Sequence, residues 1–168
     1  TVPLFAAMMH EIPARRLLEG LLFHRIKFRP FMFLILKLRG LRKLPSVKPL
    51  MAASGQAQAA MAVHLDQLEQ HLSEQGDDSP WICGTEYTLA DISWMVIFER
   101  MLEADWLEDF VRADLRPAIY DYWMRLQARP GYAGIANYRL PAVAQGTSLI
   151  RQLKAEDAEF LAAFQFQG

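Results

Sequence analysis

Residues 87–101 constrain the fold of this chain most, because they combine a helix-start signal with an apolar run. Thr88 and Asp91 stand three residues apart, the spacing of a capping box. In such a box a hydroxyl and a carboxylate each accept a hydrogen bond from the other residue's backbone N–H. Tyr87 and Ile92 occupy the two positions of a hydrophobic staple around the box. The sequence therefore predicts a helix over about residues 88–103.

The apolar run within this helix predicts burial. Nearly every residue from Leu89 to Phe98 is apolar, so the helix has no wide polar face. A bilayer span needs roughly 20 apolar residues. This run is shorter, and Asp91 and Glu99 interrupt or flank it. We therefore expect a central helix that lies inside a protein domain and is buried on all of its sides.

Charge and cysteine content narrow the function classes. The 168 residues can bury a sizeable core without a disulfide or metal. Cys83 is the single cysteine, which rules out an internal disulfide and favours a reducing compartment, the cytoplasm. The net charge of −1 predicts no overall attraction to nucleic acid, although residues 15–48 are basic and residues 64–114 mostly acidic. The chain begins at Thr1 without a leader, so we expect a piece of a longer protein.

Apolar residues recur at helical spacing along most of the chain. Pro13 should kink or divide the first helix, and Gly40 and two prolines predict a loop over residues 40–49. No alternating strand pattern is present, so the expected fold class is all-α. Helices are expected over residues 3–24, 31–38, 50–75, 117–129, 132–137 and 148–166, with a turn or short helix over residues 102–110.

The order of the motifs resembles the C-terminal helical domain of glutathione S-transferases. Pro80-Trp-Ile-Cys-Gly84 precedes Thr88-Leu-Ala-Asp91, and Arg116-Pro117 opens a later helix that ends at Ala128-Arg-Pro130. The first two motifs are most similar to the branch that contains ganglioside-induced differentiation-associated protein. The resemblance covers residues 1–137, and residues 138–168 are expected to form a helical extension packed on that domain.

The resemblance implies a division of labour. In this family an N-terminal thioredoxin-like domain binds glutathione and activates its thiol, and nothing in this chain reads as that domain, so we expect no catalytic residue here. The helical domain lines the pocket for hydrophobic electrophiles and contributes to a homo-oligomer. By position, the pocket would be lined by Phe5, Met8, Met9, Ile12 and Arg16. These residues equally suit plain packing, and the sequence leaves that alternative open.

Two other functions remain open. Residues 21–44 combine Leu, Phe and Ile with Lys and Arg, a composition that suits a helix on an anionic membrane surface. A non-catalytic scaffold is the second alternative. Metal binding is not expected, because His64 and His71 stand about two helical turns, roughly 10 Å, apart. Cys83 is expected to be buried beneath the central helix.

Overall fold

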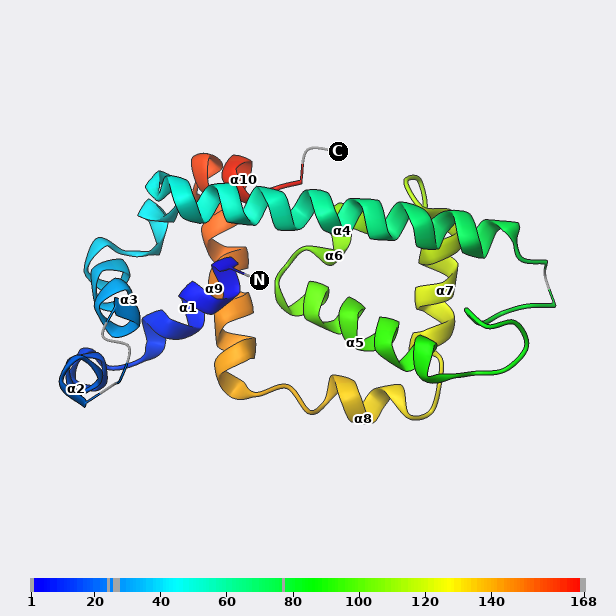
Figure 1. The fold of residues 1–168 in the computed structure, drawn as a ribbon, viewed down its shortest axis with the longest axis horizontal. Coiled ribbons are helices and arrows are strands. Elements are labelled where there is room, and N and C mark those ends of the chain that lie inside the picture. Colours follow the sequence, from blue (N-terminus) through cyan, green and yellow to red (C-terminus); the bar gives the residue numbers. More distant parts are fainter. Residues whose placement is uncertain (1, 24, 26–27, 77, 167–168) are drawn as a thin grey trace. The chain divides into compact units, whose positions relative to one another are not determined.

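The computed structural model describes residues 2–23, 25, 28–76 and 78–166. Residues 24, 26 and 27 of the basic apolar segment lie outside the described residues. The all-α prediction is confirmed, since the described ranges hold helices and a single isolated β-bridge between Trp81 and Gly84 (Figure 1). The helices are α1 (Val2–Glu11), α2 (Ala14–Phe23), α3 (Phe28–Arg39), the 3₁₀ helix η1 (Leu41–Ser46), α4 (Lys48–Glu74), α5 (Leu89–Glu103), α6 (Leu107–Phe110), α7 (Pro117–Gln127), α8 (Tyr132–Ala136), α9 (Pro141–Glu156) and α10 (Ala158–Phe164).

The chain divides into two compact units. The first unit comprises residues 1–54 and 140–165, and the second comprises residues 55–139 and 166–168. We call them the terminal unit and the central unit. The predicted division into a domain over residues 1–137 and an extension over residues 138–168 stays a prediction.

The core of the central unit is aromatic. The ring of Phe98 on α5 lies 5.3 Å from Trp123 and 6.3 Å from Tyr122, both on α7, with edge-to-face geometry. Trp123 in turn contacts Tyr132 of α8 at 5.5 Å. Edge-to-face pairs of this kind are favourable beyond the apolar area they bury. Around them the core is closed by buried residues of α4 to α7: Leu65, Leu68, Leu72, Met95, Met101, Phe110, Ile119 and Leu126.

The helix α5 is not buried on all sides, and that prediction is wrong. Leu89 is 78% exposed, and Ile92 and Val96 are also exposed. These residues follow i, i+3, i+7 spacing and so share one face of α5. The opposite face carries Met95 and Phe98, which are buried against the aromatic core. When a helix is apolar at nearly every position, its sequence does not show which face will be covered, because this depends on which elements pack against it.

Carboxylates tie α7 to α4 within the central unit. Glu69 of α4 accepts hydrogen bonds from the backbone N–H groups of Ala118 and Ile119 at 3.0 and 2.8 Å. These groups lie in the first turn of α7, where N–H groups have no partner within the helix. Asp66, one turn earlier on α4, pairs with the buried guanidinium of Arg116 at 2.6 Å. A helix start is therefore satisfied by side chains from another helix.

The core of the terminal unit is built where α1 packs on α9 and on η1. Gly146 of α9 makes this close approach possible. A Cβ atom at that position would lie 3.1 Å from Leu4 Cδ1 and 3.2 Å from Met8 Cγ. The core consists of Leu4, Ala6, Ala7, Leu41, Leu44, Val143, Ile150, Leu153, Phe160 and Phe164.

The helix boundaries of the terminal unit agree in part with the predicted ones. Pro13 does divide the first helix, and residues 31–38 lie within α3, as predicted. The predicted loop over residues 40–49 is wrong in part, because η1 occupies it and α4 begins at Lys48. Pro49 is tolerated because it lies in the first turn of α4, where the helix needs no N–H, whereas Pro45 lies inside the short η1 helix.

The predicted single helix over residues 148–166 is also wrong. The helix α9 begins earlier, at Pro141, a residue whose fixed φ suits a helix start. It ends at Glu156, and Asp157 then caps α10 by accepting from the N–H groups of Glu159 and Phe160. Asp157 is therefore a helix boundary that the apolar spacing on either side conceals.

Candidate functional site

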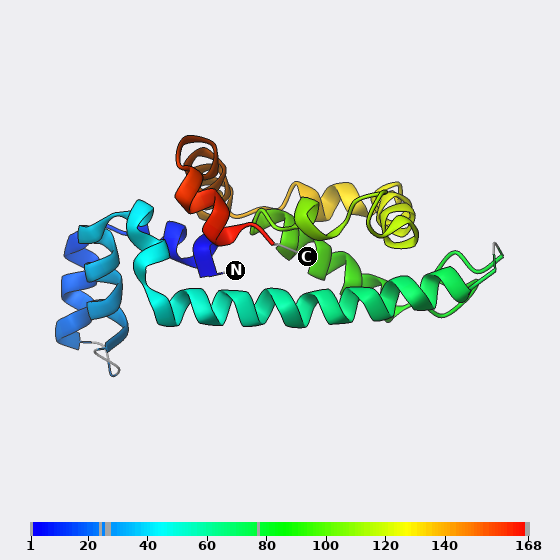
Figure 2. The same cartoon turned by 90° about the horizontal axis from the view of Figure 1, so that it is seen from above.

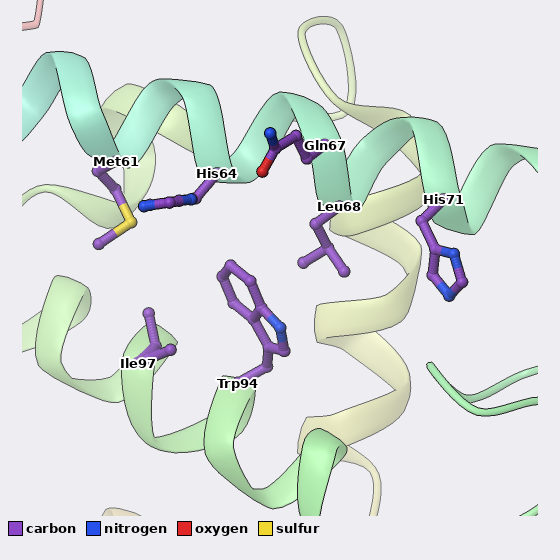
Figure 3. Close-up of a pocket in the computed structure, with 7 residues that line it drawn as sticks. All are labelled: Met61, His64, Gln67, Leu68, His71, Trp94 and Ile97. Atoms are coloured by element: carbon purple, nitrogen blue, oxygen red, sulfur yellow. The ribbon is translucent and has the colours of Figure 1, made fainter.

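A pocket of about 310 Å³ lies between α4 and α5 in the central unit (Figure 3). That volume is at the lower end of the range for small-molecule sites. Figure 3 shows the side chains of both helices pointing into the space between them. The pocket is lined by Met61, His64, Gln67, Leu68, His71, Trp94 and Ile97.

Helical spacing explains why these side chains meet. Met61, His64, Leu68 and His71 are separated by three, four and three residues, so they share one face of α4. Trp94 and Ile97 are three residues apart and share one face of α5 in the same way. Leu68 belongs to the buried core, Met61, Trp94 and Ile97 are half-buried between the helices, and the polar lining residues of α4 are exposed at the edge of the pocket.

The polar side chains of the pocket differ in their hydrogen bonds to the rest of the protein. The ring nitrogen Nε2 of His71 lies 2.8 Å from the backbone carbonyl of Ile82, which also accepts from Gln75 at 2.9 Å. His71 is thus fixed by the 81–84 turn. His64 and Gln67 are exposed on α4 and line the pocket beside Met61 and Trp94.

The lining set is suited to binding an apolar ring. Trp94 is half-buried and packs on Phe98 at 5.6 Å, so its orientation is supported by the core. A tryptophan face and a methionine thioether both accommodate aromatic ligands. The imidazole of His64 and the amide of Gln67 offer hydrogen bonds to a polar substituent. The lining residues include no hydroxyl or thiol group, and their apolar surface with a few polar groups suits binding and orienting a ligand.

Beside the pocket, the predicted capping box opens α5. The Thr88 hydroxyl accepts from the N–H of Ala90 at 3.3 Å, and the Asp91 carboxylate accepts from the N–H of Thr88 at 2.8 Å. Tyr87 packs edge-on against Trp81 at 5.0 Å and lies 3.6 Å below the guanidinium of Arg129. Ile92 is exposed, and its contact with Tyr87 as a staple stays a prediction.

Asp91 does more than the capping box requires. Its fully buried carboxylate also accepts from the N–H of Ile82 at 3.0 Å and from the hydroxyl of Tyr122 at 2.8 Å. One side chain therefore joins the 81–84 turn, the start of α5 and the middle of α7. The sequence marks Asp91 through its spacing from Thr88, but no local signal identifies Tyr122 as its partner.

These hydrogen bonds determine the protonation of both groups. Burial raises the pKa of Asp91, but the hydrogen bonds from Ile82, Thr88 and Tyr122 outweigh it and hold the pKa below its ordinary value. The carboxylate is therefore ionised at neutral pH. Burial, followed by the hydrogen bond to Asp91, raises the pKa of Tyr122 well above its ordinary value. Tyr122 accordingly remains a donor across the physiological range.

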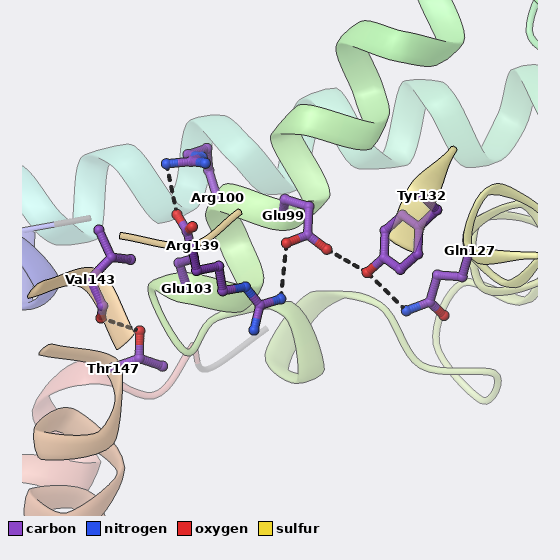
Figure 4. Close-up of polar contacts among 8 residues, drawn as sticks. All are labelled: Glu99, Arg100, Glu103, Gln127, Tyr132, Arg139, Val143 and Thr147. Carbon is purple, nitrogen blue, oxygen red and sulfur yellow. Dashed lines mark hydrogen bonds and ion pairs between the residues drawn. The ribbon is translucent and has the colours of Figure 1, made fainter. Parts of the chain in front are cut away.

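A second polar cluster lies near the end of α5 (Figure 4). Glu99 is buried and accepts from the hydroxyl of Tyr132 and from Arg139, the latter at 2.9 Å. Glu103, one turn later, pairs with Arg100 at 2.8 Å. Burial raises the pKa of Glu103 above its ordinary value. The positive charges of Arg100 and Arg139 lower this pKa and the negative charge of Glu99 raises it, but burial has the largest effect. The cluster holds α8 and residue 139 on the central helix.

The predicted pocket residues of the first helix lie in the terminal unit. Phe5 is exposed on one side and contacts Phe33 edge-on at 5.3 Å, whereas Met8, Met9 and Ile12 are half-buried. Pro13 ends this stripe, so Arg16 belongs to α2, where it pairs with Glu19 at 3.2 Å.

Cys83 is exposed, and the prediction that it is buried is wrong. The backbone of Trp81 and Gly84 forms two hydrogen bonds of 3.0 Å that turn the chain. Trp81 and Ile82 pack on the core, which leaves Cys83 on the outside of the turn. In the described ranges no three His, Cys, Asp or Glu side chains are grouped to hold a metal ion. Nor is any described helix long and apolar enough to cross a membrane.

Comparisons with known proteins point to one family. Residues 45–139 match the family model described as "Glutathione S-transferase, C-terminal domain". A curated relative, the tetrachloro-p-hydroquinone reductive dehalogenase of Sphingobium chlorophenolicum, is 34% identical over 80 residues. That match covers 46% of this chain and 28% of the relative, so it spans less than a third of the relative's length. No solved structure shows a significant match.

Proposed function

Because the chain belongs to the glutathione S-transferase family through its C-terminal domain, we propose that it forms the helical half of a glutathione-dependent enzyme. In this family the helical domain normally pairs with a thioredoxin-like domain, to which we assign glutathione binding and thiol activation. The present chain would then receive the second, hydrophobic substrate. The whole protein would conjugate glutathione to hydrophobic electrophiles, as a cytoplasmic homo-oligomer.

The pocket between α4 and α5 is the observation that carries this proposal. Its aromatic and thioether lining suits the apolar body of an electrophile, and His64 and Gln67 suit a polar substituent on it. The relative is named for tetrachloro-p-hydroquinone, a chlorinated ring with two hydroxyl groups. A halogenated aromatic compound is therefore our first choice of ligand.

The first-helix stripe is a second candidate surface. The exposed ring of Phe5 and the partly exposed Met8, Met9 and Ile12 support it. A non-catalytic scaffold is the alternative to the enzyme, and membership of the branch of ganglioside-induced differentiation-associated protein is a further proposal. That branch assignment rests on residues 80–84 followed by the capping box.

Calorimetric titration of the chain with tetrachloro-p-hydroquinone, under anaerobic conditions, tests the pocket. Ile97→Trp fills the pocket and should weaken binding at least tenfold. Val96→Trp places the same side chain on the neighbouring, exposed position of α5 and should leave binding unchanged. Equal effects of the two variants would refute the assignment. Micromolar binding of glutathione by this chain alone would refute the assignment of glutathione binding to the thioredoxin-like domain.

A further inference from the structure

The helices α2 and α3 expose large apolar side chains away from their own core. They pack against each other in the terminal unit (Figure 2). On α2, Leu17 is buried, whereas Leu22 is 70% and Phe23 85% exposed. Leu18 is half exposed and lies one turn before Leu22, on the same face. The α2 helix therefore presents an apolar surface in addition to the face that it buries.

The α3 helix repeats this pattern. Phe33 contacts Phe5, and the Lys37 ammonium donates to the backbone carbonyl of His10, so this side of α3 faces α1. Phe31 and Leu38, seven residues apart, share another face and are 51% and 78% exposed. The exposed residues are therefore not core residues with a missing neighbour on α1. Contiguous exposed apolar surfaces on monomeric proteins usually mark interaction sites.

The same segment is strongly basic. Residues 14–48 hold ten of the 18 Lys and Arg residues but only one of the 19 Asp and Glu residues, Glu19. Glu19 pairs with Arg15 and Arg16 on α2. Arg25, which lies between the two helices in the sequence, and Arg39, the last residue of α3, are exposed. The exposed apolar face thus sits in a region of large positive charge, although the whole chain has a net charge of −1.

We propose that the exposed face of α2 and α3 binds the surface of an anionic membrane. We call it the α2–α3 face: Leu18, Leu22, Phe23, Phe31 and Leu38 with Arg15, Arg25 and Arg39. Apolar side chains enter the boundary between headgroups and acyl chains, while arginine and lysine contact lipid phosphates. The helices α2 and α3 are 10 and 12 residues long, which suits helices that lie in the plane of the surface. Charge argues against a second copy as the occupant, because two such faces repel each other.

Vesicle flotation of the chain tests this proposal. The probes are vesicles of pure phosphatidylcholine and vesicles that contain 30% phosphatidylserine, each at low salt and at 0.5 M NaCl. We expect binding to the anionic vesicles at low salt, with a loss of at least fivefold either in 0.5 M NaCl or without phosphatidylserine. No binding to the anionic vesicles, or equal binding to both kinds, overturns the proposal.

Variants locate the surface. Leu22→Ser with Phe23→Ser should reduce anionic-vesicle binding at least tenfold. Leu89→Ser with Tyr138→Ser removes two comparably exposed side chains of the central unit and should have no effect. Arg25→Glu with Arg39→Glu provides a second variant should the first fail to fold, and it should lower binding at least tenfold at low salt. Loss in the control pair, or self-association of the parent that the Leu22 and Phe23 changes abolish without any vesicle binding, contradicts the proposal.

Discussion

The two units of this chain are ordered by different kinds of interaction. In the central unit the buried Asp91 and the carboxylate of Glu69 accept hydrogen bonds from helix-start N–H groups. In the terminal unit α1 approaches α9 closely because Gly146 has no side chain. Hydrogen bonds to buried donors are directional, and a missing acceptor is costly. Close packing of α1 on α9 instead limits the volume of the side chain that residue 146 can carry. The two units should therefore fail under different substitutions.

The largest loss is expected from Asp91→Ala in the central unit. The change leaves the buried donors of Ile82, Thr88 and Tyr122 without their acceptor, so the free energy of unfolding should fall by about 3–5 kcal/mol. Loss of a helix cap alone would cost about 1–2 kcal/mol. Urea unfolding measures the difference. The control Ser93→Ala, on the exposed side of α5, should change stability by less than about 0.5 kcal/mol. If Asp91→Ala lost only about 1–2 kcal/mol, Asp91 would act as a helix cap and its other hydrogen bonds would not contribute to stability.

The next effect is expected from overpacking in the terminal unit. Gly146→Leu forces a side chain against Leu4 and Met8 and should lower the free energy of unfolding by about 1–3 kcal/mol. Gly55→Ala, in α4, meets open space and should instead raise it by about 0.5–1 kcal/mol. Thermal melts of both variants provide the comparison. Stabilisation by leucine at residue 146 would show that α1 does not pack there.

A smaller effect is expected from Tyr122→Phe, which removes one donor to Asp91. We expect a loss of about 1–2 kcal/mol at neutral pH. Because the pKa of Tyr122 is raised in the folded state, its contribution is complete below the ordinary pKa of 10.0 and is lost as the pH rises above that value. The stability of the parent should therefore fall more steeply than that of the variant between pH 10 and 11.5. Parallel pH profiles would show that Tyr122 ionises as freely as an exposed tyrosine.

The difference between the units also explains what the sequence could predict. The all-α fold class and the capping box follow from local spacing, and the structure has them. Short-range patterns could not identify Tyr122 as the partner of Asp91, because 31 residues separate the two. The exposed face of α5 and the close approach at Gly146 likewise depend on which elements are neighbours.

The pocket was only partly predictable for the same reason. The shared face of His64 and His71 follows from their spacing, but their position opposite Trp94 and Ile97 depends on how α4 and α5 pack. The prediction that the first helix lines the substrate pocket came from its position in the family's helical domain. The structure places Arg16 on a different helix from Phe5 and Met8.

The central claim, that the pocket between α4 and α5 receives an aromatic electrophile, is tested most directly by the indole N–H signals of the four tryptophans. Trp94→Phe assigns the signal of the pocket residue in a ¹H–¹⁵N spectrum. On titration with tetrachloro-p-hydroquinone that signal should shift and saturate, while the signals of the buried Trp106 and Trp123 stay in place. Uniform shifts of all four signals, or a stationary Trp94 signal at saturating ligand, would contradict the account.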